Sequence, residues 1–384
     1  MKRFLSRVLP LLLSFGLIFN CTGCSTVLVL AGKARENSEA SSSVISESSA
    51  SSGVISTPVP TEDGDLRAFY TDVANAESVT VMVYMIGSDL ESEDGSATDD
   101  LLEMADAALS ENVHLVLQTG GTETWWNDVC TDDESERFVI ENGDMTLLQS
   151  LGSMNMTDAD TLSDFIRFSA ESYPADRYEL ILWDHGGGTM TGFGYDELYE
   201  DTSLTLSSLS TALYNGGVQF DFIGFDACLM ATAEVAYALD PYADYLIASE
   251  ESEPGEGWAY KNWLTMLAED PAVPTAELGK KLADDFLEAY IFADMPTLSV
   301  LDLRYVPELY AALESYWGSA YTALQSGSYG AFSQVRSNVR EFGDNEYDQV
   351  DLSDLATLTK QSLSLGTEDD VQAAVQNMVV YNVT

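Results

Sequence analysis

ELILWDHGGG, residues 179–188, is the stretch that decides the fold of this chain. Its first half, Glu179 to Trp183, is a short aliphatic run, which is typical of a strand buried on both faces of a sheet. The run leads directly into Asp184, His185 and three glycines, so an imidazole stands at the carboxyl end of a predicted strand. Glycines leave the main chain open to close approach by another molecule.

Further runs of the same kind lie on both sides of this stretch. They are Val79 to Ile86, Val113 to Thr119, Phe220 to Phe225, Tyr245 to Ser249, Leu298 to Leu303 and Val379 to Val383. Apolar residues recur at helical spacing in Asp99 to Leu109, Asp160 to Ser172 and Leu229 to Leu239. Strands that alternate with helices predict an α/β fold with a mostly parallel central sheet between helices. In such sheets the reactive groups gather at the carboxyl ends of the strands.

A thiol follows a second strand in the same way. Phe220 to Phe225 leads into Asp226 and then Cys228, and a helical pattern comes next. We expect Cys228 to lie at a helix start, where backbone amides favour the thiolate. A thiol nucleophile needs a base within hydrogen-bond reach, and the chain has only two histidines. His185 ends a strand and is the candidate base, whereas His114 lies inside a predicted strand and is expected to be structural.

Other chemistries fit these residues less well. A disulfide between Cys130 and Cys228 is the structural alternative in an exported protein, but Cys130 lies in the polar segment WNDVCTDDESE (126–136) and pairing would block the nucleophile. The sequence after residue 24 has no HxxxH or CxxC pair for a metal and no GxSxG motif for a serine hydrolase. We therefore expect no metal site and favour cysteine-based acyl transfer.

The composition describes a globular and strongly acidic chain. It has 384 residues, 46% of them apolar, which is enough for a sizeable core. Its 64 acidic and 16 basic side chains give a formal net charge of -48. Such a field repels nucleic acid, which we exclude as a partner, and attracts cationic peptides, although an acidic surface most often serves solubility.

The N-terminus has the features of an export signal. Basic residues precede the apolar run Val8 to Phe19, and small residues precede Cys24. The run is too short for a convincing membrane span. The residues around Cys24 resemble the bacterial lipoprotein processing site, which implies a cell-surface protein held to the bacterial membrane by a lipid on this cysteine. A plain cleaved signal peptide is the alternative.

The composition also predicts how the chain is divided. Serine dominates residues 36–58, which is typical of a flexible tether. We expect a lipoprotein signal peptide over residues 1–23, a Ser-rich tether over 24–64 and one folded domain over 65–384. Neither a second Ser- or Pro-rich break nor an internal repeat divides this last part.

Several blocks of the chain resemble the clostripain family of cysteine peptidases, which belongs to the same clan as the caspases. They are VTVMVYMIGSDLES (79–92), LVLQTGG (115–121), WDHGGG (183–188), FIGFDACLMATAEVA (222–236), YLIASEESEPGEGWAY (245–260) and YDQVDLSDLA (347–356). The resemblance covers roughly residues 77–383. It implies a caspase-like α/β/α sandwich, a dyad of His185 and Cys228, and an oxyanion held by the backbone amides of Gly186 and Cys228.

The same resemblance implies a substrate class. Family members cut after Arg or Lys, and a carboxylate beside the nucleophile is what holds such a side chain. Asp226 occupies the corresponding position of the family, with a helix N-cap as its alternative role. Glu250, Glu251 and Glu253, on the loop after the predicted strand at 245–249, are further candidates for the pocket wall.

The chain departs from the family pattern in two places. Some members cut themselves after a basic residue between the histidine and the cysteine, but residues 186–227 contain neither Lys nor Arg. We therefore expect an uncut chain, or activation elsewhere, for instance near Arg177 or Lys261. Relatives usually continue beyond a final strand such as 379–383, so a truncation after Thr384 is an alternative to consider.

The chemistry itself requires no cofactor. Some family members depend on calcium, and the acidic loops 89–100 and 196–201 are candidate ligands, although neither has EF-hand spacing. A competing function is a catalytically inactive surface lipoprotein that binds cationic peptides. The presence of both His185 and Cys228 favours the peptidase.

Overall fold

The computed structural model describes residues 66–199, 202–290, 296–343 and 347–384. The predicted signal peptide, Cys24 and the Ser-rich tether lie outside these residues, and the predictions made for them stay predictions. Within the described ranges, no helix combines the length and the hydrophobicity needed to cross a membrane.

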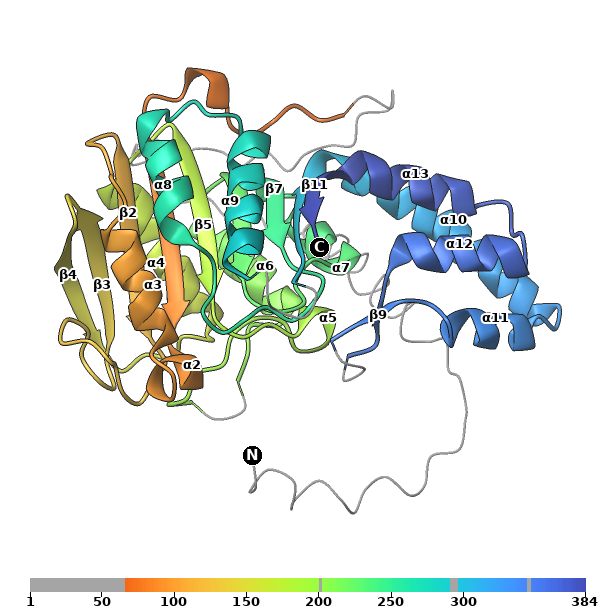
Figure 1. The fold of residues 1–384 in the computed structure, drawn as a ribbon, viewed down its shortest axis with the longest axis horizontal. Helices are drawn as coiled ribbons and strands as arrows, with labels where there is room; N and C mark the ends of the chain where they lie inside the picture. Colours follow the sequence, from red (N-terminus) through yellow and green to blue (C-terminus); the bar gives the residue numbers. More distant parts are fainter. Residues whose placement is uncertain (1–65, 200–201, 291–295, 344–346) are drawn as a thin grey trace, which may run out of the picture. The chain divides into compact units, whose positions relative to one another are not determined.

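A nine-stranded sheet forms the centre of the described residues (Figure 1), in the order β11-β8-β7-β6-β5-β1-β2-β3-β4. The strands are β1 (Val79–Ile86), β2 (Val113–Gly120), β3 (Ser135–Glu141), β4 (Asp144–Gly152), β5 (Arg177–Trp183), β6 (Phe220–Asp226), β7 (Ala243–Ala248), β8 (Leu298–Asp302) and β11 (Val379–Val383). Strands β2, β1, β5, β6 and β7 run parallel. β3 and β8 run antiparallel to the strands on either side of them. The prediction of a mostly parallel sheet is confirmed.

Helices cover both faces of this sheet. One face packs against α4 (Ala159–Ser172), α6 (Leu206–Gly216) and α7 (Ala233–Leu239), and the other against α3 (Ser96–Ala105), α8 (Tyr260–Glu269) and α9 (Thr275–Ala289). Alternate side chains of β1 enter the two separate apolar clusters, which is why the whole strand is buried and reads as a continuous apolar run. In Figure 1, α3, α8 and α9 lie in front of the sheet. The result is the predicted α/β/α sandwich.

The C-terminal part adds further helices and a short hairpin. The helices are α10 (Val306–Gln325), α11 (Tyr329–Arg336), α12 (Leu352–Ser362) and α13 (Glu368–Met378), and the hairpin pairs β9 (Glu341–Phe342) with β10 (Gln349–Val350). α13 packs against both α10 and α12 and then leads into β11, the edge strand of the sheet.

The largest difference from the predicted elements follows β6. A helix was expected from Leu229, but α7 begins at Ala233, and the Thr232 side chain caps it by accepting the Val235 N–H. Leu229 has a positive φ of 69°, which a right-handed helix does not allow. Cys228 therefore lies in a turn that precedes the helix.

A buried arginine braces the end of the sheet where β5 begins. Arg177 is the first residue of β5, is fully buried, and pairs with Glu179 at 3.0 Å and Asp221 at 2.7 Å. It also donates hydrogen bonds to the Pro271 and Val273 carbonyls. Burial raises the pKa of Glu179 to about 8 despite the nearby guanidinium. Because Arg177 is buried within a central strand, the folded domain does not offer it as an activation cleavage site.

Replacement of Arg177 by Met should destabilise the domain by about 3–5 kcal/mol, because it leaves Glu179 and Asp221 buried without a counter-charge. Urea unfolding followed by circular dichroism measures the loss. Lys280→Met is the matched control, since it removes an exposed pair with Asp284 and should leave the unfolding free energy nearly unchanged. Similar losses in the two variants would contradict a bracing role for Arg177.

Candidate active site

The predicted catalytic residues follow adjacent parallel strands. Trp183 of β5 pairs with Asp226 of β6, and the Asp184 N–H extends the pairing to the Asp226 carbonyl at 3.2 Å. His185 and Cys228 therefore leave the sheet at the same edge. This is the carboxyl edge of the parallel strands, where such folds collect their reactive groups.

Gly186 lets the two segments touch. A Cβ atom on Gly186 would lie 2.1 Å from the Cys228 carbonyl oxygen, so only a residue without a side chain fits there. Among the described residues, no backbone carbonyl accepts a hydrogen bond from the backbone N–H of Gly186 or of Cys228. Both amides are therefore available to an oxyanion, the role predicted for them.

The Cys228 thiol is held by the loop that follows β7. Its sulfur accepts a hydrogen bond from the Glu253 N–H at 3.2 Å and lies 3.8 Å from the Glu253 carbonyl oxygen. Burial raises the pKa of Cys228, and the Glu253 N–H opposes this effect only in part. The helix start expected at this position is absent, since α7 begins five residues later at Ala233. Burial therefore favours the protonated thiol over the thiolate.

The turn that carries the nucleophile is strained and tightly held. The Leu229 N–H donates to the Glu251 carbonyl at 3.1 Å, and the Ala231 N–H donates to the Ser249 carbonyl at 2.8 Å. These bonds hold Leu229 at its positive φ, a conformation that persists in bulky residues only where the surroundings impose it.

His185 is half-exposed and hydrogen-bonded to a carboxylate. Its Nε2 lies 2.7 Å from Oδ1 of Asp89, in α2 (Ser88–Ser92), and 43% of the His185 side chain is exposed. Desolvation lowers the pKa of His185, but the hydrogen bond to Asp89 and the charges of Asp184 and Asp89 outweigh it, so the pKa is raised overall. Asp184 accepts the Tyr195 N–H, and its charge contributes to the raised pKa of His185.

The sequence did not single out Asp89 as a site residue. The signal available in the sequence is that Asp89 lies just beyond the apolar run that forms β1. The structure adds that β1 is the neighbour of β5 in the sheet. Its residue block, GSDLES, also belongs to the segments that resemble the family.

Asp226 is the last residue of β6 and is buried two residues before Cys228. Its Oδ2 accepts hydrogen bonds from the Trp258 N–H at 3.0 Å and the Tyr260 hydroxyl at 2.7 Å. It caps no helix, because Thr232 caps α7, and the alternative N-cap role is therefore wrong. Burial raises the pKa of Asp226 in spite of these donors.

Asp226 belongs to a cluster of buried carboxyls. No described N–H or hydroxyl group donates to either buried carboxylate oxygen of Glu253, and the Glu253 carboxyl instead forms a side-chain hydrogen bond with that of Asp226. Oδ2 of Asp100 accepts the Trp183 indole N–H at 2.6 Å. Burial raises the pKa of Asp100 and of Glu253, and the charges that act on them belong to other acidic groups. A hollow of about 340 Å³ borders this cluster and is lined in part by Asp100 and Glu256.

The other two glutamates of this loop have structural partners. Oε1 of Glu251 accepts the Gly343 N–H at 2.7 Å and the Ser252 N–H at 3.1 Å. Oε1 of Glu250 accepts the Ser299 hydroxyl at 2.6 Å. Of Glu250, Glu251 and Glu253, only Glu253 has a carboxylate that accepts no hydrogen bond from a described N–H or hydroxyl group.

The C-terminal hairpin rests on both catalytic segments. The Gln349 side chain donates to the Leu229 carbonyl at 3.4 Å. A Cβ atom on Gly187 would lie 3.3 Å from the Tyr347 ring, and one on Gly188 would collide with Gln349. The block YDQVDLSDLA (347–356) carries the family resemblance here, but nothing in its sequence predicts that it lies beside the segments of His185 and Cys228.

The remaining candidates lie outside this arrangement. Cys130 and Cys228 are both free, so the disulfide alternative is wrong. Burial raises the pKa of Cys130 to about 12, which makes it unreactive. His114 lies in β2, with its ring centre 5.3 Å from that of Tyr173, as expected of a strand residue.

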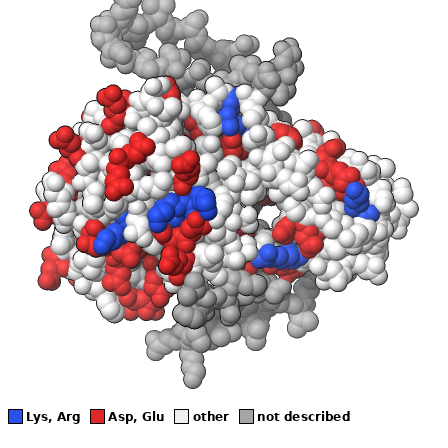
Figure 2. Space-filling view, turned by 45° about the horizontal axis from the view of Figure 1, so that its top comes forward, with Lys and Arg blue, Asp and Glu red and all other residues white. Residues whose placement is uncertain are grey.

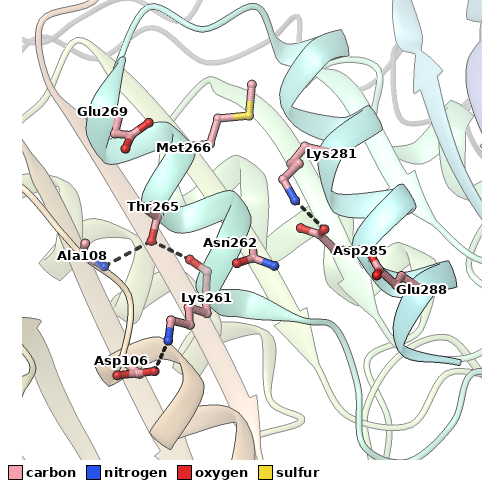
Figure 3. Close-up of a pocket in the computed structure, with 10 residues that line it drawn as sticks. All are labelled: Asp106, Ala108, Lys261, Asn262, Thr265, Met266, Glu269, Lys281, Asp285 and Glu288. Atoms are coloured by element: carbon pink, nitrogen blue, oxygen red, sulfur yellow. Dashed lines mark hydrogen bonds and ion pairs between the residues drawn. The ribbon is translucent and has the colours of Figure 1, made fainter.

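Charged surface groups form no second centre of this kind. Figure 2 shows acidic side chains spread over the visible face, with Lys and Arg in a few small groups. A pocket of about 580 Å³ between α8 and α9 contains neither catalytic residue, and its Lys261 and Lys281 pair with Asp106 and Asp285 (Figure 3). Over the described ranges, no group of three or more His, Cys, Asp or Glu side chains is arranged to hold a metal ion.

Comparison with known proteins agrees with this geometry. The family profile described as "Clostripain family" matches residues 83–384. Clostripain from Hathewaya histolytica is 35% identical over 123 residues, which are 28% of this chain and 23% of clostripain. The aligned part thus spans about a quarter of that curated relative.

Two crystal structures share the fold. A secreted C11 cysteine protease from Bacteroides thetaiotaomicron, in complex with an irreversible peptide inhibitor, matches with a TM-score of 0.62 at 19% identity over 80% of this chain and 84% of that chain. An inactive zymogen C11 protease from Parabacteroides distasonis matches with a TM-score of 0.59 at 24% identity over 80% of this chain and 83% of that chain.

The profile match extends over most of the chain and includes both strands that carry the site. The solved structures reproduce the sandwich on which these strands depend. The chain therefore belongs to the clostripain family of cysteine peptidases.

Proposed function

We propose that this protein is an endopeptidase that hydrolyses peptide bonds through Cys228 and His185, after Arg or Lys. The observation that carries the proposal is that a thiol and an imidazole follow the paired ends of adjacent parallel strands, beside two backbone amides that donate to no described backbone carbonyl. A nucleophile, a base and an oxyanion site are the groups that acyl transfer requires.

The proposed reaction has two halves. His185 takes the proton of the Cys228 thiol, and the sulfur forms a bond to the scissile carbonyl carbon while the Gly186 and Cys228 amides hold the oxyanion. His185 then returns the proton to the leaving amine as the C–N bond breaks. In the second half, His185 takes a proton from water, the hydroxide displaces the sulfur from the thioester, and the thiol is restored.

The proposed pocket for the basic side chain uses Asp226 and Glu253. Both carboxyls are buried close to Cys228, and no described cation forms an ion pair with either. A Lys or Arg side chain of a substrate would supply the missing counter-charge. Glu251 is left out of this pocket because its carboxylate already accepts two backbone N–H groups.

The remaining predictions complete the proposal. Export with a lipid on Cys24 would place the enzyme at the cell surface, where its partners are proteins or peptides with basic residues, and not nucleic acid. The Cys–His chemistry needs no cofactor, and calcium stays an untested ligand. Absence of Lys and Arg from residues 186–227 supports an enzyme that works as an uncut chain.

Replacement of either catalytic residue should abolish cleavage. We expect Cys228→Ala and His185→Ala to lower kcat/KM on a fluorogenic Arg substrate by at least about 10³-fold. The thiol and the imidazole act together in the proposed reaction, so the loss of either one disables both. His114→Ala is the control and should retain wild-type activity. Undiminished cleavage by Cys228→Ala would refute the assignment, and an inactive wild type whose Cys228 fails to react with a basic peptide probe would favour the cationic-peptide binder.

Asp226→Asn should reduce cleavage after Arg by about 10- to 100-fold while leaving cleavage after apolar residues nearly unchanged, because it removes a charge-assisted contact. Asp99→Asn, an exposed acid at the rim of the adjacent hollow, is the control. An equal loss of kcat/KM on basic and apolar substrates would indicate that Asp226 has a structural role instead.

The same carboxyl gives a pH dependence with a defined sign. Burial raises the pKa of Asp226, and only the ionised form attracts a cation. The ratio of kcat/KM for Arg over apolar substrates should therefore rise with pH in the wild type and stay flat in Asp226→Asn. A ratio that falls with pH in the wild type would contradict the pocket.

Gly186→Ala should lower kcat/KM by about 10²–10³-fold, because its Cβ would push against the Cys228 carbonyl and displace an oxyanion amide. Gly318→Ala is the matched control, since a Cβ there meets no atom within 4 Å. Kinetics and thermal unfolding of both variants separate the two effects. Wild-type kinetics in Gly186→Ala would remove this amide from the site.

A further inference from the structure

A carboxylate approaches the proposed base on the side of its Nε2 atom. Oδ1 of Asp89 lies 2.7 Å from that nitrogen. The two residues come from neighbouring strands, because Met85 of β1 pairs with Trp183 of β5. Asp89 and His185 thus each lie a few residues beyond the last pair of residues that joins β1 to β5.

The backbone around Asp89 is fixed on both sides. The Gly87 N–H donates to the Gly120 carbonyl at 2.8 Å, and the Ser88 N–H donates to the Gly121 carbonyl at 3.1 Å. Ser88 is fully buried and held at a positive φ of 49°. A non-glycine residue stays in this conformation only where its surroundings impose it. The strain lies immediately before Asp89 and directs its side chain toward the ring.

A second carboxylate fixes the short helix α2 itself. Glu91 is fully buried and accepts hydrogen bonds from the Thr98 N–H at 2.8 Å, the Thr98 hydroxyl at 2.6 Å and the Trp126 N–H at 2.6 Å. α2 is therefore clamped to the start of α3 and to the loop after β2. Asp89, two residues earlier in the chain, therefore lies in a helix that is held in place.

The chemistry of the pair determines which ring nitrogen is the base. The hydrogen bond from His185 lowers the pKa of Asp89, so this carboxyl is ionised and can only accept. Nε2 must then carry the ring proton, which leaves the lone pair of a neutral imidazole on Nδ1. Nδ1 is thus the atom available to take a proton, and no proton passes to Asp89.

Other charged groups around the ring do not supply this contact. Asp184 accepts the Tyr195 N–H, and burial raises its pKa to about 7. The Tyr195 ring lies edge-on, with its centre 6.4 Å from that of His185. Of the described side chains, Asp89 alone forms an ion pair with His185.

We propose that Asp89 is the positioning residue of the catalytic base: it fixes the tautomer of His185 and stabilises the imidazolium formed when Cys228 loses its proton. This inference rests on the proposed peptidase function. An exposed ion pair adds little to folding stability, so the contribution of Asp89 belongs to catalysis.

The test combines kinetics with a readout that needs no activity. Asp89→Asn removes the charge, Asp89→Ala removes the hydrogen bond and Asp89→Glu keeps both. The matched control is Asp94→Asn, an exposed acid beyond the same helix. We expect kcat to fall by about 10- to 100-fold in the Asn and Ala variants, with KM and the thermal midpoint close to wild type, and partial recovery in the Glu variant.

The ionisation of His185 is measured directly by NMR of the imidazole in a Cys228→Ala background. The chain has only two histidines, so His114→Gln assigns the signals. Asp89→Asn should lower the pKa of His185, and Asp89→Ala should also reduce the population of the Nε2–H tautomer. An unchanged pKa and tautomer, or a kcat within twofold of wild type, would overturn the role of Asp89. An inactive wild type with the expected NMR shifts would overturn the peptidase function alone.

Discussion

Parallel pairing of β5 with β6 is the constraint on which the site depends. Trp183 and Asp226 are paired, and the chains that follow them emerge side by side. Gly186 then lies so close to the Cys228 carbonyl that no side chain fits between them. Because side chains alternate along a strand, a slip of one residue would exchange the side chains of β5 between the two apolar clusters that it enters. Close packing on both faces of the sheet therefore fixes the register of β5 against β6.

The two ends of β5 and β6 differ in how their buried carboxyl groups are paired. At the start of β5, Arg177 pairs with Glu179 and Asp221 inside the core. Because burial raises the pKa of Glu179 to about 8, the guanidinium mainly balances the charge of Asp221. At the opposite end, Asp100, Asp226 and Glu253 are buried with no such cation. Buried carboxyls without a counter-charge are costly, and burial accordingly raises the pKa of all three.

Much of this arrangement follows from the sequence, and the remainder has definite physical causes. The parallel strands and the positions of His185 and Cys228 are readable because a strand buried on both faces leaves an unbroken apolar run. The delayed start of α7 is not readable, since it depends on Leu229 being held by carbonyls of a distant loop. The contact of Asp89 with His185 depends likewise on strand order, because β1 lies beside β5 although many residues separate them in the chain. The hairpin over the site reaches it from the C-terminal helices, and its residues carry no chemical signal.

The electrostatics of the thiol links substrate binding to chemistry. Burial raises the pKa of Cys228, and the charge of Asp226 raises it further. In the proposed mechanism, the imidazolium beside Asp89 would offset this negative surrounding when the proton moves from Cys228 to His185. In the proposed function, a basic side chain held by Asp226 and Glu253 would cancel the same charge from the other side. Binding of the correct substrate would then lower the free energy of the thiolate as well as position the scissile bond, whereas an apolar substrate would leave the acidic field in place. The uncompensated carboxyls would thus contribute to selectivity in the chemical step and not only in binding.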